Sequence, residues 1–132
     1  MELFNSNSIG KVFSWHDISQ VHKVRNGIYQ KNGKVISLLT DFGEINPCYP
    51  DRTGETNDTI FYTGAGRRGD QRLDVYNQSL HNAIKTQVEV PLFCKIKVNE
   101  WKFMGYWQVV DAEYVFEKKN KRNIWSFVLK KV

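Results

Sequence analysis

The feature that most constrains this chain is a glycine-rich, basic segment that lies between a predicted strand and a predicted helix within residues 60–84. The sequence IFY at 60–62 is β-branched and aromatic and favours the end of a strand, whereas GAGRRG at 64–69 interrupts regular structure. A glycine-rich loop that leads into a helix presents backbone N–H groups to phosphate, and Arg67 and Arg68 add guanidinium donors. The segment lacks the Gly-Lys-Ser/Thr ending of a Walker A loop. It therefore predicts an anion-binding loop of another kind, with a flexible basic loop as the alternative.

Asp74 predicts the start of a one-sided helix, because aspartate is a favourable N-cap. Apolar side chains then recur at helical spacing on one face: Tyr76, Leu80, Ala83 and Ile84. The polar side chains are expected to face away from the core: Asn77, Gln78, His81, Asn82 and Lys85. One amphipathic helix is thus expected to pack against a sheet.

The first forty residues predict a short helix and a hairpin. A capping box led by Ser14 opens the helix, which ends near residue 22. Strands at 27–29 and 34–39 are then joined by the dipeptide Asn32-Gly33, which is typical of a type I′ turn.

The remaining segments predict further strands and one long loop. Residues 41–59 are rich in turn-forming residues, and 88–98 read as a strand in which Pro91 favours an edge position or a bulge. Strands at 106–116 and 124–132 flank the basic sequence EKKNKRN, which predicts a hairpin with an exposed tip. Together these elements predict an α+β fold: a curved sheet or partial β-barrel with one main helix and a short N-terminal helix.

Composition favours a single domain over residues 1–132 that binds an anionic partner. Nineteen Lys and Arg against fourteen Asp and Glu give a formal net charge of +5, and 14% of residues are aromatic. Cys48 and Cys94 are far apart, without zinc-ligand spacing, so free thiols in a reducing compartment are expected. No apolar run is long enough to span a membrane. A cytoplasmic protein without a metal site or cofactor is predicted.

The sequence contains few patterns that are typical of an enzyme active site. Glu117 and Lys119 have the Glu-x-Lys spacing of a metal-dependent nuclease, with Asp111 as a second carboxylate, but they fall where a strand gives way to a predicted charged turn. The three histidines lie far from any obvious nucleophile: His16, His22 and His81. No catalytic residue is predicted, although a small hydrolase or nuclease assembled only in space stays an alternative.

A nucleic-acid reader needs aromatic platforms, a polar contact to a base edge and a grip on phosphate. Tyr49 and Tyr62 supply platforms, and Asp51 supplies an acceptor for an exocyclic amine, with Thr63 as a second polar contact. The predicted phosphate contacts are Arg67, Arg68, Arg72, Gly64 and Gly66.

Several segments resemble the SRA domain (SET- and RING-associated, also called YDG) of the PUA-like superfamily. The similar segments are HKVRNGIYQKNGKVISLLTD at 22–41, YPD at 49–51, FYTGAG at 61–66, GDQ and NQSL within 69–80, GYWQVVDAEY at 105–114 and FVLKK at 127–131. The resemblance covers about residues 21–131 and implies a curved sheet that binds DNA and flips a modified cytosine into a pocket.

The resemblance also implies roles for individual residues. Tyr49 and Tyr62 would sandwich the flipped base, while Asp51 and Thr63 would read its Watson–Crick edge. Backbone of the segment Thr40, Asp41 and Phe42 would line the pocket. The stretch between Leu39 and Tyr62 is longer than the family pattern, so Asp41 and Asp58 stay alternatives to Asp51.

The loop after Gly66 is too short for the finger with which eukaryotic members fill the vacated space in the duplex. This implies a bacterial, nucleoid-associated member, a group often found beside a nuclease domain in modification-dependent restriction systems. The expected partner is double-stranded DNA carrying 5-methylcytosine or 5-hydroxymethylcytosine, with a fused or separate nuclease of HNH type. Reading of phosphorothioate, N6-methyladenine or RNA stays an alternative.

Overall fold

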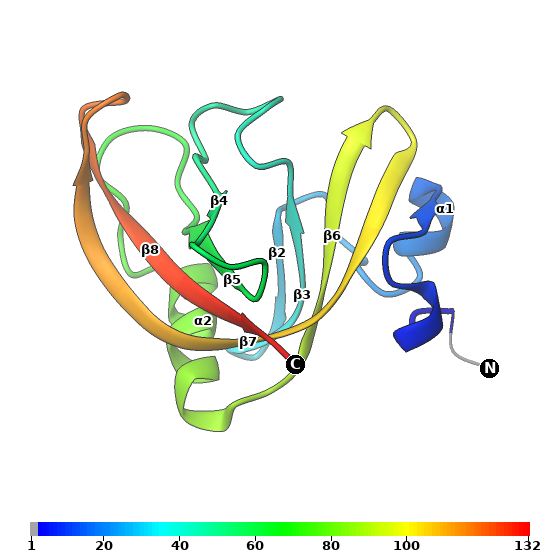
Figure 1. The fold of residues 1–132 in the computed structure, drawn as a ribbon. Coiled ribbons are helices and arrows are strands. Elements are labelled where there is room, and N and C mark those ends of the chain that lie inside the picture. Colours follow the sequence, from blue (N-terminus) through cyan, green and yellow to red (C-terminus); the bar gives the residue numbers. More distant parts are fainter. Residues whose placement is uncertain (1–2) are drawn as a thin grey trace.

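The computed structural model describes residues 3–132, whose strands form one strongly curved sheet (Figure 1). Its strands are β1 (Val12–Phe13), β2 (Ile28–Lys31), β3 (Lys34–Thr40), β4 (Arg52–Thr53), β5 (Thr59–Thr63), β6 (Val90–Lys97), β7 (Glu100–Glu117) and β8 (Arg122–Lys131). The helices are the 3₁₀ helix η1 (Ser6–Ser8), α1 (Trp15–Ile18) and α2 (Val75–Thr86). The α+β class predicted from the sequence is confirmed.

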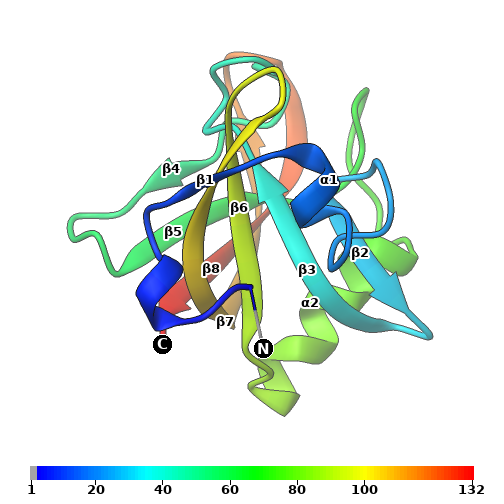
Figure 2. The ribbon, with the colours of Figure 1, turned by 90° about the vertical axis from the view of Figure 1, so that its right-hand side faces the viewer.

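The strand order is β2-β3-β6-β7-β8-β5-β4, and β1 pairs with β7 outside this path. All pairings are antiparallel except β3 with β6, which is parallel and aligns Leu38 with Leu92. Parallel strands need a long crossover connection, and between β3 and β6 the chain passes through β4, β5 and α2. The sheet curls without closing, since β2 and β4 stay at its two edges. Figure 2 shows the N-terminal segment crossing in front of β6 and α2 lying behind β3.

Local sequence signals set several of the strand boundaries. Asn32 and Gly33 both have positive φ, 53° and 79°, so the predicted type I′ turn between β2 and β3 is confirmed. Pro91 pairs with Tyr106 next to a shift in register, which confirms the predicted bulge. The edge alternative for Pro91 is wrong because β6 lies between β3 and β7.

The core divides into two clusters of buried side chains. The larger cluster joins α2 to the concave side of the sheet: Ile28, Val35, Leu38, Ile60, Tyr62, Leu80, Ala83, Val90, Leu92, Trp107, Val109, Phe127 and Leu129. The smaller one lies under the N-terminal segment: Phe4, Ile18, Phe93, Trp101 and Phe103. No helix within residues 3–132 is both long enough and apolar enough to cross a membrane.

Two predictions, the end of the first helix and the loop over residues 41–59, need correction. The first helix begins as predicted, with the Ser14 side chain accepting from the Asp17 N–H at 3.2 Å, but it ends at Ile18 rather than near residue 22. His22 is fully buried beyond it, and its two ring nitrogens contact the Ser37 hydroxyl at 2.7 Å and the Asn26 carbonyl at 2.6 Å. The predicted long loop over 41–59 also contains β4.

The prediction that Asn77 faces away from the core is also wrong, because Asn77 lies on the buried side of α2 and is fully buried. Its side chain accepts from the Ala65 N–H at 2.7 Å and donates to the carbonyls of Ala65 and Arg72 at 3.0 and 2.7 Å. The helix therefore uses an internal amide to hold the loop between β5 and α2. Buried amides of this kind are satisfied by backbone because an unpaired polar group is costly.

Gly64 shows how closely this loop packs. A Cβ at this position would lie 2.5 Å from Asn77 Oδ1, 2.9 Å from Trp125 Cβ and 3.0 Å from Gln71 Oε1. The glycine is needed here for close packing of side chains against the backbone.

Gly64→Ala is therefore expected to lower the free energy of unfolding by about 1–3 kcal/mol, because overpacking displaces Asn77 and Trp125. Urea unfolding followed by tryptophan fluorescence measures this. Gly27→Ala is the matched control, since its Cβ would meet nothing closer than 3.4 Å. Equal stability losses in the two variants would contradict the packing role of Gly64.

Candidate functional site

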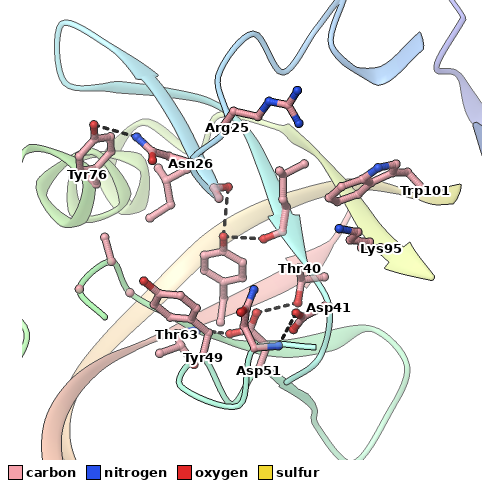
Figure 3. A pocket seen from close by; sticks show the side chains of 18 of the residues that line it. Arg25, Asn26, Thr40, Asp41, Tyr49, Asp51, Thr63, Tyr76, Lys95 and Trp101 are labelled. Carbon is pink, nitrogen blue, oxygen red and sulfur yellow. Dashed lines mark hydrogen bonds between the residues drawn. The ribbon is translucent and has the colours of Figure 1, made fainter. Parts of the chain in front are cut away.

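A cavity of about 520 Å³ opens where the ends of β3 and β5 face the start of α2 (Figure 3). Segments far apart in the sequence contribute to it, including α1, the loop before β4 and the β6–β7 hairpin. Its lining residues are Trp15, Arg25, Asn26, Gly27, Ile28, Leu39, Thr40, Asp41, Asn46, Tyr49, Asp51, Tyr62, Thr63, Gly64, Ala65, Gly66, Asp74, Tyr76, Lys95 and Trp101.

Asp51 is the buried carboxylate of this cavity, with 6% of its surface exposed. One oxygen accepts from the Thr40 hydroxyl at 2.6 Å and the other from the Thr63 N–H at 2.6 Å. Burial raises the pKa of Asp51 from 3.8 to about 6, and the hydrogen bonds from Thr40 and Thr63 oppose that rise. The Asp51 carboxyl group is thus ionised at neutral pH, but burial of its charge lowers the stability of the folded protein.

Tyr62 forms a rigid wall of the cavity and is 3% exposed. Its hydroxyl donates toward the carbonyls of Leu39 and Gly27, at 2.8 and 3.2 Å (Figure 3). Burial holds the pKa of this phenol well above its usual value. Tyr62 is therefore both a core residue and a lining residue.

Tyr49 is half-buried and lies on the loop that leads to Asp51. Arg122 holds this loop, because its guanidinium donates to the Cys48 carbonyl at 2.6 Å and also to the carbonyls of Gly66 and Gly69. Burial raises the pKa of Tyr49, and Arg122 and Arg67 oppose that rise. The prediction that the β7–β8 tip is wholly exposed is wrong at Arg122, which is 4% exposed.

The structure distinguishes between the three carboxylates that the sequence left as alternatives for the contact to the base edge. Asp41 lines the cavity, but its oxygens accept from the N–H groups of Gly43 and Asn46 at 2.8 and 2.9 Å and so shape the loop. Asp58 is exposed and does not line the cavity. Asp51 alone of the three is buried at the cavity wall.

The other predicted residues divide between the cavity and the outside. Thr40, Thr63, Gly64 and Gly66 line it, whereas Phe42 packs against the larger core cluster. The Gly64 N–H donates to the Trp125 carbonyl at 2.9 Å, so it is not available to phosphate. The arginines expected to contact phosphate are exposed and lie outside the lining: Arg67, Arg68 and Arg72.

Sequence reasoning missed the wall formed by Trp15, Arg25, Lys95 and Trp101. The Trp15 and Trp101 rings are 5.4 Å apart, the Arg25 guanidinium lies 4.8 Å from the Trp15 ring, and Lys95 Nζ lies 5.7 Å from the Trp101 ring. Lys95 and Trp101 are cross-strand partners in the β6–β7 hairpin, whereas Trp15 and Arg25 come from the N-terminal segment. Tertiary structure is therefore needed to bring the two pairs together.

The groups considered for catalysis have structural partners. The Glu117 carboxylate accepts from the N–H groups of Lys119 and Asn120 at 2.7 and 3.1 Å, as expected of a charged turn. His81 packs edge-on against Trp125 at 4.5 Å. Residues 3–132 contain no group of three His, Cys, Asp or Glu side chains placed to bind a metal.

The same fold occurs in solved SRA structures. The structure of SUVH5 SRA with hemi-methylated CG DNA gives a TM-score of 0.78 at 20% identity, over 100% of this chain and 93% of that chain. SUVH5 SRA bound to fully hydroxymethylated CG DNA gives 0.73 at 21% identity, over 95% and 89%. The modification-dependent TagI restriction endonuclease gives 0.76 at 20% identity, and the match covers 94% of this chain but 49% of that one.

Sequence comparison narrows the relationship. A family model described as "ScoMcrA-like, SRA domain" matches residues 10–132. No curated protein is similar enough in sequence to count as a relative.

The raised pKa of Asp51 predicts how stability depends on pH. The folded state binds the proton more tightly than the unfolded state, so stability is greatest below about pH 4 and falls by about 3 kcal/mol as the pH rises to about 6. Asp51→Asn is expected to abolish this fall. Urea unfolding at pH 4, 5, 6 and 7 measures it, with Asp41→Asn as the control for loss of a cavity carboxylate. Parallel pH profiles of wild type and Asp51→Asn would contradict the assignment.

Proposed function

The chain belongs to the ScoMcrA-like SRA domain family, and we propose that it is a reader domain that flips a modified cytosine out of duplex DNA into the cavity of Asp51. The single observation that carries this proposal is the buried carboxylate, held by Thr40 and Thr63 in a cavity that Tyr49 and Tyr62 also line. The solved complexes of SUVH5 SRA with hemi-methylated and hydroxymethylated CG DNA support the choice of ligand.

The cavity suits one extruded base. Its volume of about 520 Å³ exceeds that of a nucleobase and leaves room for a small substituent. Tyr62 is fixed by its hydroxyl and Tyr49 is held on the loop anchored by Arg122, so both rings are positioned before a base enters. Aromatic stacking and hydrogen bonds to the base edge are the means by which flipped bases are held.

Asp51 supplies the base-specific contact. The carboxylate accepts hydrogen bonds from the Thr40 hydroxyl, the Thr63 N–H and the Thr63 side chain, which leaves one of its about four lone-pair sites for the N4 amine of cytosine. Thymine carries O4 at that position and would place two acceptors face to face. The Thr63 hydroxyl, beside the carboxylate, supplies the second polar contact, and the backbone of Thr40 and Asp41 bounds the space for the 5-substituent.

The proposed protein is a recognition module over residues 1–132 that contacts duplex phosphates through Arg67, Arg68 and Arg72 and performs no chemistry itself. A nuclease, of HNH type, would act from a fused or partner domain in a modification-dependent restriction system. The TagI endonuclease supports this arrangement, because the match to this chain covers only 49% of that protein.

Tyr49→Ala is expected to weaken binding of modified duplex by about 1–3 kcal/mol through loss of stacking, with a smaller effect on unmodified duplex. Tyr49 is the suitable test because it is half-buried, whereas removal of the Tyr62 ring would open the core. Fluorescence anisotropy measures affinity for duplexes carrying cytosine, 5-methylcytosine, 5-hydroxymethylcytosine, N6-methyladenine or phosphorothioate, and for RNA. Preference for one of the last three ligands would overturn the cytosine proposal.

Asp51→Asn is expected to narrow the gap between 5-methylcytosine and a thymine mispair, because the amide can turn a donor toward O4. The unpaired acceptor in wild type is worth about 1–3 kcal/mol, which corresponds to roughly 5- to 150-fold discrimination. Competition binding with the two duplexes measures the ratio, and Asp41→Asn and Asp58→Asn serve as controls. If the affinity ratio between the 5-methylcytosine duplex and the thymine mispair falls in Asp41→Asn or Asp58→Asn but not in Asp51→Asn, the carboxylate that contacts the base is not Asp51.

A further inference from the structure

The wall of Trp15, Arg25, Lys95 and Trp101, here called the cation–aromatic ladder, lines the same cavity as Tyr49. Figure 3 shows Arg25, Lys95 and Trp101 across the cavity from Tyr49. In the ladder the Trp15 and Trp101 rings lie side by side at an angle of 47°, the Arg25 guanidinium lies over the Trp15 ring and Lys95 Nζ lies over the Trp101 ring. Cations over aromatic faces are attracted by the ring quadrupole and restricted in their motion. The ladder therefore presents two positioned positive charges at the rim of the cavity.

The aromatic part of the ladder is firmly built into the fold. Trp101 is 8% exposed and belongs to the smaller core cluster, while the backbone N–H of Trp15 donates to Asn99 Oδ1 at 2.8 Å. This hydrogen bond ties the start of α1 to the turn between β6 and β7. Because Arg25 and Lys95 rest on these fixed rings, their charges lose little additional freedom when a ligand binds.

The two cations are not neutralised by neighbouring carboxylates. Among residues 3–132 the ion pair that forms is Lys97 with Glu100, so neither Arg25 nor Lys95 has a carboxylate partner. The cavity carboxylates are instead engaged elsewhere: Asp41 by its own loop, Asp51 by Thr40 and Thr63, and Asp74 by the Asn77 N–H at the start of α2. Arg25 and Lys95 therefore carry positive charges that line the cavity without an ion-pair partner in the described part of the chain.

We propose that the ladder binds the phosphates on either side of the flipped nucleotide, an inference that rests on the proposed function. A base that enters the cavity takes its sugar to the mouth, and the flanking phosphates then run along the rim where Arg25 and Lys95 lie. Phosphate is the favoured ligand because each tryptophan ring already contacts a cation and the other tryptophan, so the charged groups rather than the rings are the available contacts. Guanidinium and ammonium groups form charge-assisted hydrogen bonds to phosphate oxygens.

The ladder and the exposed arginines between β5 and α2 (Arg67, Arg68 and Arg72), here called the arginine loop, then have separate roles. Arg67, Arg68 and Arg72 lie outside the cavity and meet any duplex, whereas Arg25 and Lys95 meet phosphates only when a nucleotide has left the stack. Loss of the ladder should therefore weaken binding of modified DNA selectively. Loss of the arginine loop should weaken modified and unmodified DNA alike.

The test compares the double variant Arg25→Ala/Lys95→Ala with wild type and with Lys97→Ala. Lys97 is a matched control because it lies on the same hairpin as Lys95 but points its charge at Glu100, outside the cavity. We expect the double variant to lose about tenfold or more in affinity for a 5-methylcytosine duplex and less than about twofold for the unmodified duplex. The slope of log Kobs against log salt concentration for the modified duplex should become shallower by about 0.9 per lost phosphate contact.

A chemical change in the DNA isolates the contact. Neutral methylphosphonates at the two phosphates that flank the modified cytosine should weaken wild type and Lys97→Ala but should not weaken the double variant further. Additive losses in the double variant would overturn the proposal, because they would place the cations away from these phosphates. Equal weakening of modified and unmodified duplexes would overturn it as well.

Two further measurements separate the possible failures. Arg25→Lys/Lys95→Arg keeps both charges and should retain most of the affinity, and a thermal melt confirms that each variant is folded. If this variant loses as much affinity as the alanine variant while still folded, side-chain shape rather than charge is responsible and the phosphate assignment is wrong. If wild type itself does not prefer a modified duplex, the proposed function fails before the ladder is in question.

Discussion

The rest of this structure depends on how the two ends of an unclosed sheet are joined. The sheet curls far enough to bring β5 opposite β3, yet no backbone ladder connects them, since β5 pairs with β8 and β4. Side chains make the connection: Tyr62 of β5 donates to the carbonyl of Leu39 in β3, and Asp51 accepts from Thr40 and Thr63 at the ends of the two strands. The candidate site is this polar seam.

A polar seam is an expensive way to join two strands. The raised pKa of Asp51 means that its burial opposes folding at neutral pH, and an apolar contact of the same size is often the more stable choice. The hydrogen bonds from Thr40 and Thr63 reduce the penalty without removing it. A group that weakens the fold yet is held by two short hydrogen bonds is explained more readily by ligand recognition than by stability, and strongly perturbed carboxyl groups in clefts are candidates for function on the same grounds.

The sequence predicted those features whose causes are local. The Asn32-Gly33 turn and the Asp74 N-cap depend on the conformation of a few adjacent residues, and both are present in the structure. The predictions for Asn77 and Arg122 were wrong because a polar residue in a helix or a charged tip normally faces solvent. Their partners, the carbonyls of Ala65 and Cys48, are brought to them by tertiary structure.

The candidate site was predictable to the extent that its residues resemble a known pattern. Tyr49, Asp51, Tyr62 and Thr63 could be named in advance, and the structure brings all four to one cavity. The pattern did not decide between Asp41, Asp51 and Asp58, because that choice depends on which carboxylate the curled sheet buries. The cation–aromatic ladder was not predictable as a whole, because Lys95 and Trp101 pair across one hairpin but meet Trp15 and Arg25 only through tertiary structure.

The loops around the mouth are irregular, but they are fixed from within. Gln71 is 3% exposed and donates to the carbonyls of Gly64 and Gly66, Asn77 holds both backbone groups of Ala65, and Arg122 joins Gly66 and Gly69 to Cys48. These contacts satisfy the buried backbone and leave the side chains of Arg67 and Arg68 directed outward. A site ordered in this way pays little conformational entropy when it binds. Under the proposed function, the deformation needed for recognition comes from the DNA, so bases that leave the duplex stack most readily are favoured before any hydrogen bond to Asp51 is made.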